Sequence, residues 1–225
     1  EMNDDRLYWE NDGGMKNLLI IVLLGVLCVP AYADSPHDKD IEVKVYLDGE
    51  DVLVDVNFTV LASIHQVWDV LTDFDHMTSF ISNLQSSKIT GRSGTVVQVS
   101  QKGVAKHVMM IFPFESVREI RLFPYEKILS HMVSGTMRKM EGETRLIDEG
   151  DQTHVVYHVD VVPGAWIPPV LGKVFIEHEI REQFREIRDE ILKRKQAETK
   201  QARADVRRLL PVDRPARLVQ KVQPA

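Results

Sequence analysis

The hydrophobic pattern of the chain is clearest over residues 166–195. Apolar residues recur there three or four positions apart, and charged residues occupy most positions between them. This spacing places the apolar side chains on one face of a helix. Pro168 and Pro169 suit the first turn, where their missing N–H groups would have no partner anyway. The pattern predicts a long amphipathic helix whose apolar face must be covered by the rest of the chain.

The residues before this helix alternate with the period of two that is typical of β-strands. Residues 41–47 and 52–60 flank an Asp-Gly turn, which predicts a β-hairpin. Seven further strands are predicted at 88–90, 95–100, 106–114, 119–122, 128–134, 136–147 and 154–162.

Two short helices are predicted between the hairpin and the later strands. Ser63 is suited to cap the first, and residues 74–84 form the second. Strands and helices that are segregated along a chain indicate an α+β fold. We therefore expect a twisted antiparallel sheet wrapped around the long C-terminal helix.

Residues 15–33 carry the three parts of a secretory signal peptide. Lys16 supplies a positive charge, residues 18–29 form an apolar run, and a small-x-small cleavage pattern ends at Ala33. We interpret residues 1–14 as an upstream, non-native extension. A retained N-terminal anchor is the alternative to cleavage. The signal peptide predicts export to a bacterial periplasm.

The net charge of −6 hides an uneven distribution. From Lys193 onward, ten basic residues stand against three acidic ones. Residues 196–225 are predicted to form a basic flexible tail, with a short helix at 202–210 as the alternative. Such a tail would dock on an anionic membrane surface or would only add solubility. A chain that is acidic overall is not expected to bind nucleic acid.

Sequence motifs for catalysis and metal binding are absent. The single cysteine, Cys28, lies in the predicted signal peptide, so the mature chain would have no disulfide and no thiol nucleophile. The chain has no glycine-rich phosphate loop, no G-x-S-x-G and no H-E-x-x-H. On a strand, His154 and His158 would lie about 13 Å apart, too far to share one ion. We expect no catalytic residue, cofactor or metal.

Methionine and phenylalanine are concentrated in the predicted strands. Residues 106–114 are mostly apolar, and Met132, Met137 and Met140 follow in the next strands. Methionine is flexible and suits a cavity with variable contents. The same residues would equally fill an ordinary core, so both interpretations remain open at this point.

Residues 60–84, VLASIHQVWDVLTDFDHMTSFISNL, resemble the opening motif of the START-like, helix-grip superfamily. Residues 135–142 are similar to its late strand pair, residues 157–169 to its last strand and helix start, and residues 183–187 to the helix itself. The chain most resembles bacterial coenzyme Q-binding START domains and polyketide cyclase/dehydrase proteins.

The resemblance implies a helix-grip domain over residues 34–195, with a cavity between the sheet and the C-terminal helix. Apolar pockets usually hold a few polar groups that orient the ligand. The polar candidates here are Arg138, Tyr157 and His158, with Glu115 and Arg118 ranked below them. The other cavity candidates are Phe74, Phe80, Met110, Phe112, Met137, Trp166, Val174 and Phe184.

Three functions remain open, because the superfamily includes lipid carriers, aromatase/cyclases and hormone receptors. The first is an exported binding or transfer protein for a lipid-like or isoprenoid, quinone-like molecule. The second is a cyclase/dehydratase-type enzyme in which His158, Tyr157 or Arg138 moves protons. The third is an interaction module with a filled core. The Met- and Phe-rich strands, the resemblance and the signal peptide favour the first.

Overall fold

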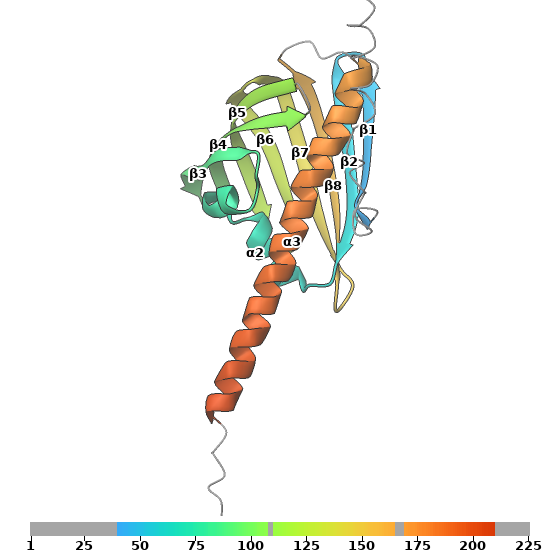
Figure 1. The fold of residues 1–225 in the computed structure, drawn as a ribbon. Helices are drawn as coiled ribbons and strands as arrows, with labels where there is room; N and C mark the ends of the chain where they lie inside the picture. The colour runs from blue at the N-terminus through green and yellow to red at the C-terminus, as the bar shows by residue number, and fades with distance from the viewer. Residues whose placement is uncertain (1–39, 108–109, 165–168, 210–225) are drawn as a thin grey trace, which may run out of the picture. The chain divides into compact units, whose positions relative to one another are not determined.

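A computed structural model describes residues 40–107, 110–164 and 169–209 of the chain (Figure 1). The predicted signal peptide, the predicted extension before it and residues 210–225 lie outside these ranges. Within the described ranges, no helix combines the length and the apolar character that a membrane crossing requires.

Eight strands form one antiparallel sheet in the order β1-β2-β8-β7-β6-β5-β4-β3. Successive strands from β3 to β8 are neighbours, and β8 closes the series by pairing with β2. The strands are β1 (Glu42–Asp48), β2 (Asp51–Val60), β3 (Leu84–Ser93), β4 (Val96–His107), β5 (Met110–Phe123), β6 (Lys127–Gly135), β7 (Met137–Asp148) and β8 (Thr153–Pro163).

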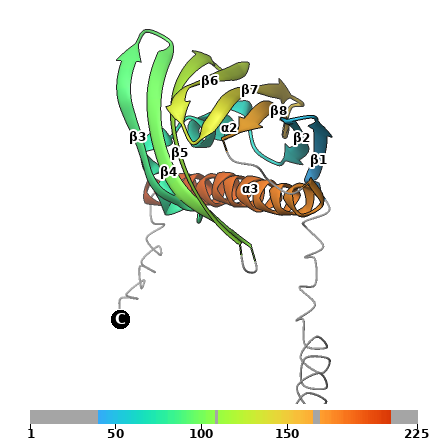
Figure 2. The ribbon, with the colours of Figure 1, turned by 90° about the horizontal axis from the view of Figure 1, so that it is seen from above.

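Three helical segments accompany the sheet: α2 (Ile64–Leu71), the 3-10 helix η3 (Phe74–Ser79) and α3 (Pro169–Leu209). Figure 2 shows that the sheet curves strongly and that α3 lies across its concave side. The helix contacts β1 near one edge of the sheet and β4 near the other. The predicted α+β helix-grip fold is therefore confirmed.

The start of α2 follows the prediction in detail. The Ser63 hydroxyl accepts a hydrogen bond from the Gln66 backbone N–H, and the Gln66 side-chain oxygen accepts one from the Ser63 N–H. This reciprocal pair is a capping box, which satisfies two backbone donors at the helix start. The local sequence thus fixes where the chain leaves β2 and enters the helices.

Three elements differ from the prediction. The predicted strand 106–114 is divided: its first residues continue the predicted strand 95–100 in β4, and its last residues form one strand, β5, with the predicted strand 119–122. His107 at the end of β4 pairs with Met110 at the start of β5. The predicted helix 74–84 ends as a 3-10 turn at Ser79. The long helix does not stop near Lys195 but continues to Leu209, so the first part of the predicted flexible tail is helical. Residues 196–209 contain no glycine or proline, and most are good helix formers.

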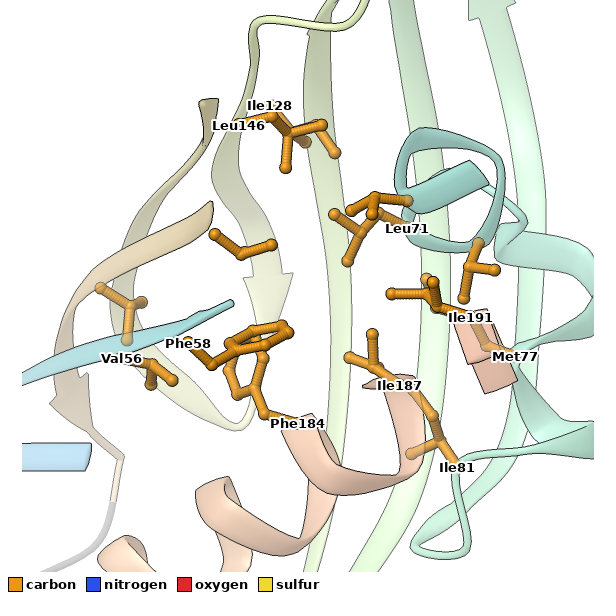
Figure 3. Packing of buried hydrophobic residues seen from close by; sticks show 14 of the residues in the cluster. Val56, Phe58, Leu71, Met77, Ile81, Ile128, Leu146, Phe184, Ile187 and Ile191 are labelled. Carbon is orange, nitrogen blue, oxygen red and sulfur yellow. The ribbon is translucent and has the colours of Figure 1, made fainter. Parts of the chain in front are cut away.

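The packed core runs from the β1–β2 hairpin to α2, η3 and the middle of α3, and Figure 3 shows part of it. Inward-facing side chains of the sheet meet α2, η3 and the middle of α3 there. Six apolar side chains of these elements have no exposed area: Val56, Val97, Val99 and Val155 on the sheet, Val67 on α2 and Ile191 on α3. Each apolar side chain of this size contributes about 1.5–3 kcal/mol when fully buried.

Polar contacts fix α3 against the segment between β2 and β3. The Arg194 guanidinium donates to Asp73 at 2.8 Å and to Glu190 at 2.9 Å, and it lies 5.6 Å from the centre of the Phe80 ring. Burial alone would raise the pKa of Asp73, but hydrogen bonds from His76 and Arg194 outweigh it and lower that pKa. The position of α3 across the sheet is therefore set by specific contacts as well as by packing.

Candidate functional site

The inner face of the grip changes character away from α2. Six apolar or aromatic side chains pack against the core there but keep part of their surface exposed: Phe114, Met140, Tyr157, Val161, Ile176 and Ile180. They come from β5, β7, β8 and α3. We call the region that these six residues define the open half of the grip. Partly exposed apolar surface on a concave face is what a pocket for a hydrophobic ligand requires.

Aromatic rings connect α3 to the sheet on both sides of β6 and β7. The rings of Phe112 on β5 and Phe175 on α3 lie 5.0 Å apart between centroids. On the other side, Tyr157 on β8 lies 5.1 Å from Phe184, which in turn meets Phe58 at 5.7 Å. Such ring pairs add about 0.5–1.5 kcal/mol each beyond their buried area. They hold the helix at a fixed distance above the sheet.

A small polar cluster faces the same interior from β3, β4 and β5. The Arg118 guanidinium donates a hydrogen bond to the side-chain oxygen of Gln101. The Gln101 amide group donates to the Ser87 hydroxyl at 3.0 Å and contacts the Met77 sulfur at 3.3 Å. Gln101 and Ser87 are 7% and 1% exposed. This cluster places one formal positive charge inside the grip.

The charge of Arg118 has no acidic partner among the residues that the structure describes. Burial lowers the pKa of its guanidinium, and the one opposing electrostatic contribution comes from Tyr157. An arginine nevertheless stays charged at neutral pH. Burial also raises the pKa of the Tyr157 phenol to about 12, so this group stays protonated. The interior therefore contains a cation and a neutral phenol.

Raising the pH from 10 to 12 is expected to destabilise the wild type more than a Tyr157→Phe variant. The folded pKa of about 12 exceeds the ordinary value of 10.0, so in this window the unfolded chain releases a proton that the folded chain keeps. Stability then falls as the pH rises. At pH 12, the free energies of unfolding of the two proteins, measured by urea denaturation, should have diverged by about 2–3 kcal/mol. If both free energies fall equally as the pH rises, the phenol is not buried.

Three of the predicted cavity candidates, Phe112, Tyr157 and Phe184, make these ring contacts between the sheet and α3. Two others belong to the region around α2. Phe74 is buried in the packed core, and Phe80 lies beneath the Arg194 guanidinium.

The remaining candidates are distributed differently from the prediction. Met137 is partly buried opposite Pro163 at the start of β7. The structure leaves Arg138, His158 and Val174 exposed. The side chain of Met110 and the whole of Trp166 lie outside the described residues.

The two exposed polar candidates are engaged in surface pairs. Arg138 pairs with Glu50 at 2.8 Å and donates to the Pro163 carbonyl at 3.1 Å. His158 Nδ1 lies 2.7 Å from an Asp55 carboxylate oxygen. Neighbouring residues of a strand point to opposite faces of the sheet. Tyr157 faces inward, so His158 must face outward.

The sequence favours Arg138 and His158 over Arg118, whereas in the structure the Arg118 guanidinium is the one of these three groups that faces the interior. Alternation along β5 could have located Arg118. Because β4 and β5 pair without a register shift, Phe112, Phe114 and Arg118 lie on the same face of the sheet. The sequence pattern predicts a strand that ends at residue 114, so the predicted alternation does not extend to Arg118. Side chains are assigned to the two faces of a sheet by alternation, so the assignment holds only if the strand is followed without interruption.

The outer face of the sheet carries a polar hollow of about 480 Å³. Its lining includes His131, Glu141, Glu143, His158 and Asp160. His131 and Glu141 pair across β6 and β7 at 2.5 Å. The other three contact surface residues outside this set: His158 lies beside Asp55, Asp160 beside Lys139 and Glu143 beside Arg145. Across the described ranges, no set of three or more His, Cys, Asp or Glu side chains is placed to hold a metal ion.

An antiparallel sheet curved around one long C-terminal helix defines a START-like, helix-grip protein. A family model described as "Polyketide cyclase / dehydrase and lipid transport" matches residues 60–188, more than half of the 225 residues. The chain belongs to this family. The match runs from the end of β2 into α3, so β1 and the last turns of α3 lie beyond it. No curated protein sequence shows significant similarity to the chain.

Solved structures share the fold at low sequence identity. The STAR-related lipid transfer protein from Xanthomonas axonopodis is 14% identical, with a TM-score of 0.58 over 68% of this chain and 94% of that one. The aromatase/cyclase ZhuI from Streptomyces sp. R1128 is 17% identical, with a TM-score of 0.55 over 64% and 95%. Human StAR-related lipid transfer protein 5 is 9% identical, with a TM-score of 0.51 over 80% and 95%. At these identities the similarity establishes the fold alone.

Proposed function

We propose that the protein binds and transfers a hydrophobic, lipid-like or isoprenoid molecule between the sheet and α3. The observation that carries this proposal is the open half of the grip, where apolar side chains of four elements remain partly exposed on a concave face. Covering such surface contributes about 25 cal/mol for each Å² removed from water. The family description includes lipid transport, and two of the structural neighbours are named as lipid transfer proteins.

Action at the bacterial envelope is part of the same proposal. The signal-peptide pattern over residues 15–33 supports export to the periplasm. A quinone-like ligand is suggested by the resemblance to coenzyme Q-binding START domains. Carriage of such a molecule between membranes would require a protein that encloses its apolar part during transit, which the grip geometry suits.

Cyclisation of a polyketide-like substrate is the alternative that the family description also includes. Of the three residues expected to move protons, only Tyr157 faces the interior. Its phenol, with a pKa raised to about 12, is a hydrogen-bond donor at neutral pH and a poor general base. The geometry therefore favours binding over acid–base catalysis.

Native mass spectrometry tests the proposal directly. The protein is purified from the periplasm without detergent, and bound molecules are released by solvent extraction. We expect one lipid or quinone molecule for each protein chain. Protein that carries nothing and takes up no neutral apolar dye, such as N-phenyl-1-naphthylamine, would contradict the proposal and favour an interaction module. A bound polyketide that is chemically altered on incubation would favour the cyclase.

A further inference from the structure

Buried polar groups on the inner face of the grip lack hydrogen-bond partners. The Nε atom of Arg118 is buried and has no hydrogen-bond partner, and the same is true of the Ser130 hydroxyl. The Tyr157 phenol is protonated, as described above, and no hydrogen bond to it is found in the described part of the chain. The Gln101 oxygen already accepts a hydrogen bond from a terminal nitrogen of the Arg118 guanidinium. Donors without acceptors in a buried site indicate that an acceptor comes from elsewhere.

These donors lie close to one another on the inner face. Arg118 and Ser130 come from the neighbouring strands β5 and β6, where Ser130 pairs with Ile120, two residues along from Arg118. Tyr157 is near enough to Arg118 for each to affect the charge state of the other. Tyr157 also belongs to the open half of the grip, so the donors border the apolar surface described above.

The charge matters more than the number of donors. Moving an ion out of water into a protein interior costs several kcal/mol, and buried charges are therefore normally paired. Arginine cannot avoid this cost by losing its proton. The described acidic residues provide no partner within 4.0 Å of Arg118. An anion entering the grip would remove the penalty and would gain charge-assisted hydrogen bonds from the fork of the guanidinium.

We propose that the open half of the grip binds an apolar molecule that carries one oxyanion group, a carboxylate or a phosphate monoester, with Arg118 as its counter-ion. The inference deepens the proposed function and rests on it, because the apolar part of the molecule occupies the space between sheet and helix. Arg118 fixes the direction in which the ligand enters. Its acidic end points toward β4 and β5, and its apolar part contacts Met140, Val161 and Ile180.

The test compares ligands that differ only in the end group. Palmitic acid, hexadecyl phosphate and hexadecanol compete with N-phenyl-1-naphthylamine for the protein at neutral pH, each below its micelle concentration. We expect at least one of the two anions to displace the dye at about 10- to 100-fold lower concentration than hexadecanol, as charge-assisted hydrogen bonds predict. The anion that binds more tightly identifies the source of the oxyanion.

Variants of two arginines on β5 test whether Arg118 causes the preference for anions over hexadecanol. Arg118→Gln should bring the anions and hexadecanol to equal affinity, while Arg118→Lys should keep part of the preference. Arg121→Gln is the matched control, because Arg121 is exposed on the outer face of β5 and should leave the preference unchanged. Circular dichroism confirms that each variant is folded.

The outcomes separate the two proposals. Equal affinity of the wild type for anions and alcohol, or a preference that survives in Arg118→Gln, would overturn the role of Arg118 while leaving an apolar carrier intact. Failure of the wild type to take up the dye, the alcohol or either anion would overturn the proposed function itself, and this inference with it.

Discussion

Replacing Ile180 by glutamate is expected to abolish binding of a neutral apolar dye. Ile180 lies on the face of α3 that is turned to the sheet and keeps part of its surface exposed in the open half of the grip. A bound apolar molecule would cover the new carboxylate and leave it without water, which costs several kcal/mol. We expect affinity to fall by about 100-fold or more, measured by fluorescence titration with N-phenyl-1-naphthylamine.

Val174→Glu is the matched control for this prediction. It places the same charge on the same helix, but Val174 is 61% exposed and points away from the sheet. Dye affinity and thermal stability should both stay at the wild-type level. If Ile180→Glu unfolds the protein instead of only preventing dye binding, Ile180 belongs to an ordinary packed core and the open half is not a binding site.

Replacing Arg118 by methionine is expected to make the ligand-free protein more stable. The partly buried charge of Arg118 has no acidic partner among the described residues, and methionine has a similar length and adapts its shape. Exchanging buried ionic groups for well-packed apolar ones has raised stability by about 1–4 kcal/mol in other proteins. We expect a gain of that order in the free energy of unfolding, measured by urea denaturation of delipidated protein.

The comparison with Arg121→Met distinguishes burial of charge from a general effect of removing an arginine. Arg121 is exposed on the same strand, so its replacement should change stability by less than about 0.5 kcal/mol. A loss of stability in Arg118→Met would show that the hydrogen bond to Gln101 matters more to the fold than the unpaired charge costs. Taken with the ligand test, a gain would mean that stability is given up here for recognition.

The elements of the fold that follow from local pattern could be predicted from the sequence. The apolar stripe of the long helix predicted that Phe184, Ile187 and Ile191 would be buried, and they are. The alternation on both sides of the Asp-Gly turn likewise predicted the β1–β2 hairpin, in which Asp48 pairs with Asp51. In each case the information lies within a few residues of the element that it specifies.

The β4–β5 connection could not be predicted in the same way. It interrupts a run of methionine and phenylalanine and contains none of the usual turn residues. Gly103, a residue type that is usual in turns, lies within β4. A side chain there would meet the Phe114 ring and the Asn83 carbonyl, so this glycine is required by close packing. Such packing is a tertiary property, and it leaves no local signal.

The candidate site was predicted only in part, for a related reason. Which side chains face one another depends on the register of a strongly curved sheet, and an error of one residue exchanges the two faces. Tyr157 and His158 were both proposed for the cavity, although neighbouring strand positions cannot both point inward. The polar groups that meet inside the grip come from β3, β4, β5, β6 and β8, and nothing in the linear sequence places them together.

The length of α3 has a consequence for how the backbone of this helix opens. Glu198 accepts a hydrogen bond from Gln66 at 2.6 Å, and all residues from 196 to 208 are exposed. An isolated helix of this size is only marginally stable in water, because its first turn is costly to form. Here the buried turns around Ile187 and Ile191 act as the nucleus. Each later residue therefore only extends an existing helix and does not have to start a new one. Amide hydrogen exchange should therefore slow progressively from Leu209 back toward Ile191, and the last turns can fray and re-form while the turns beside the proposed binding site stay closed.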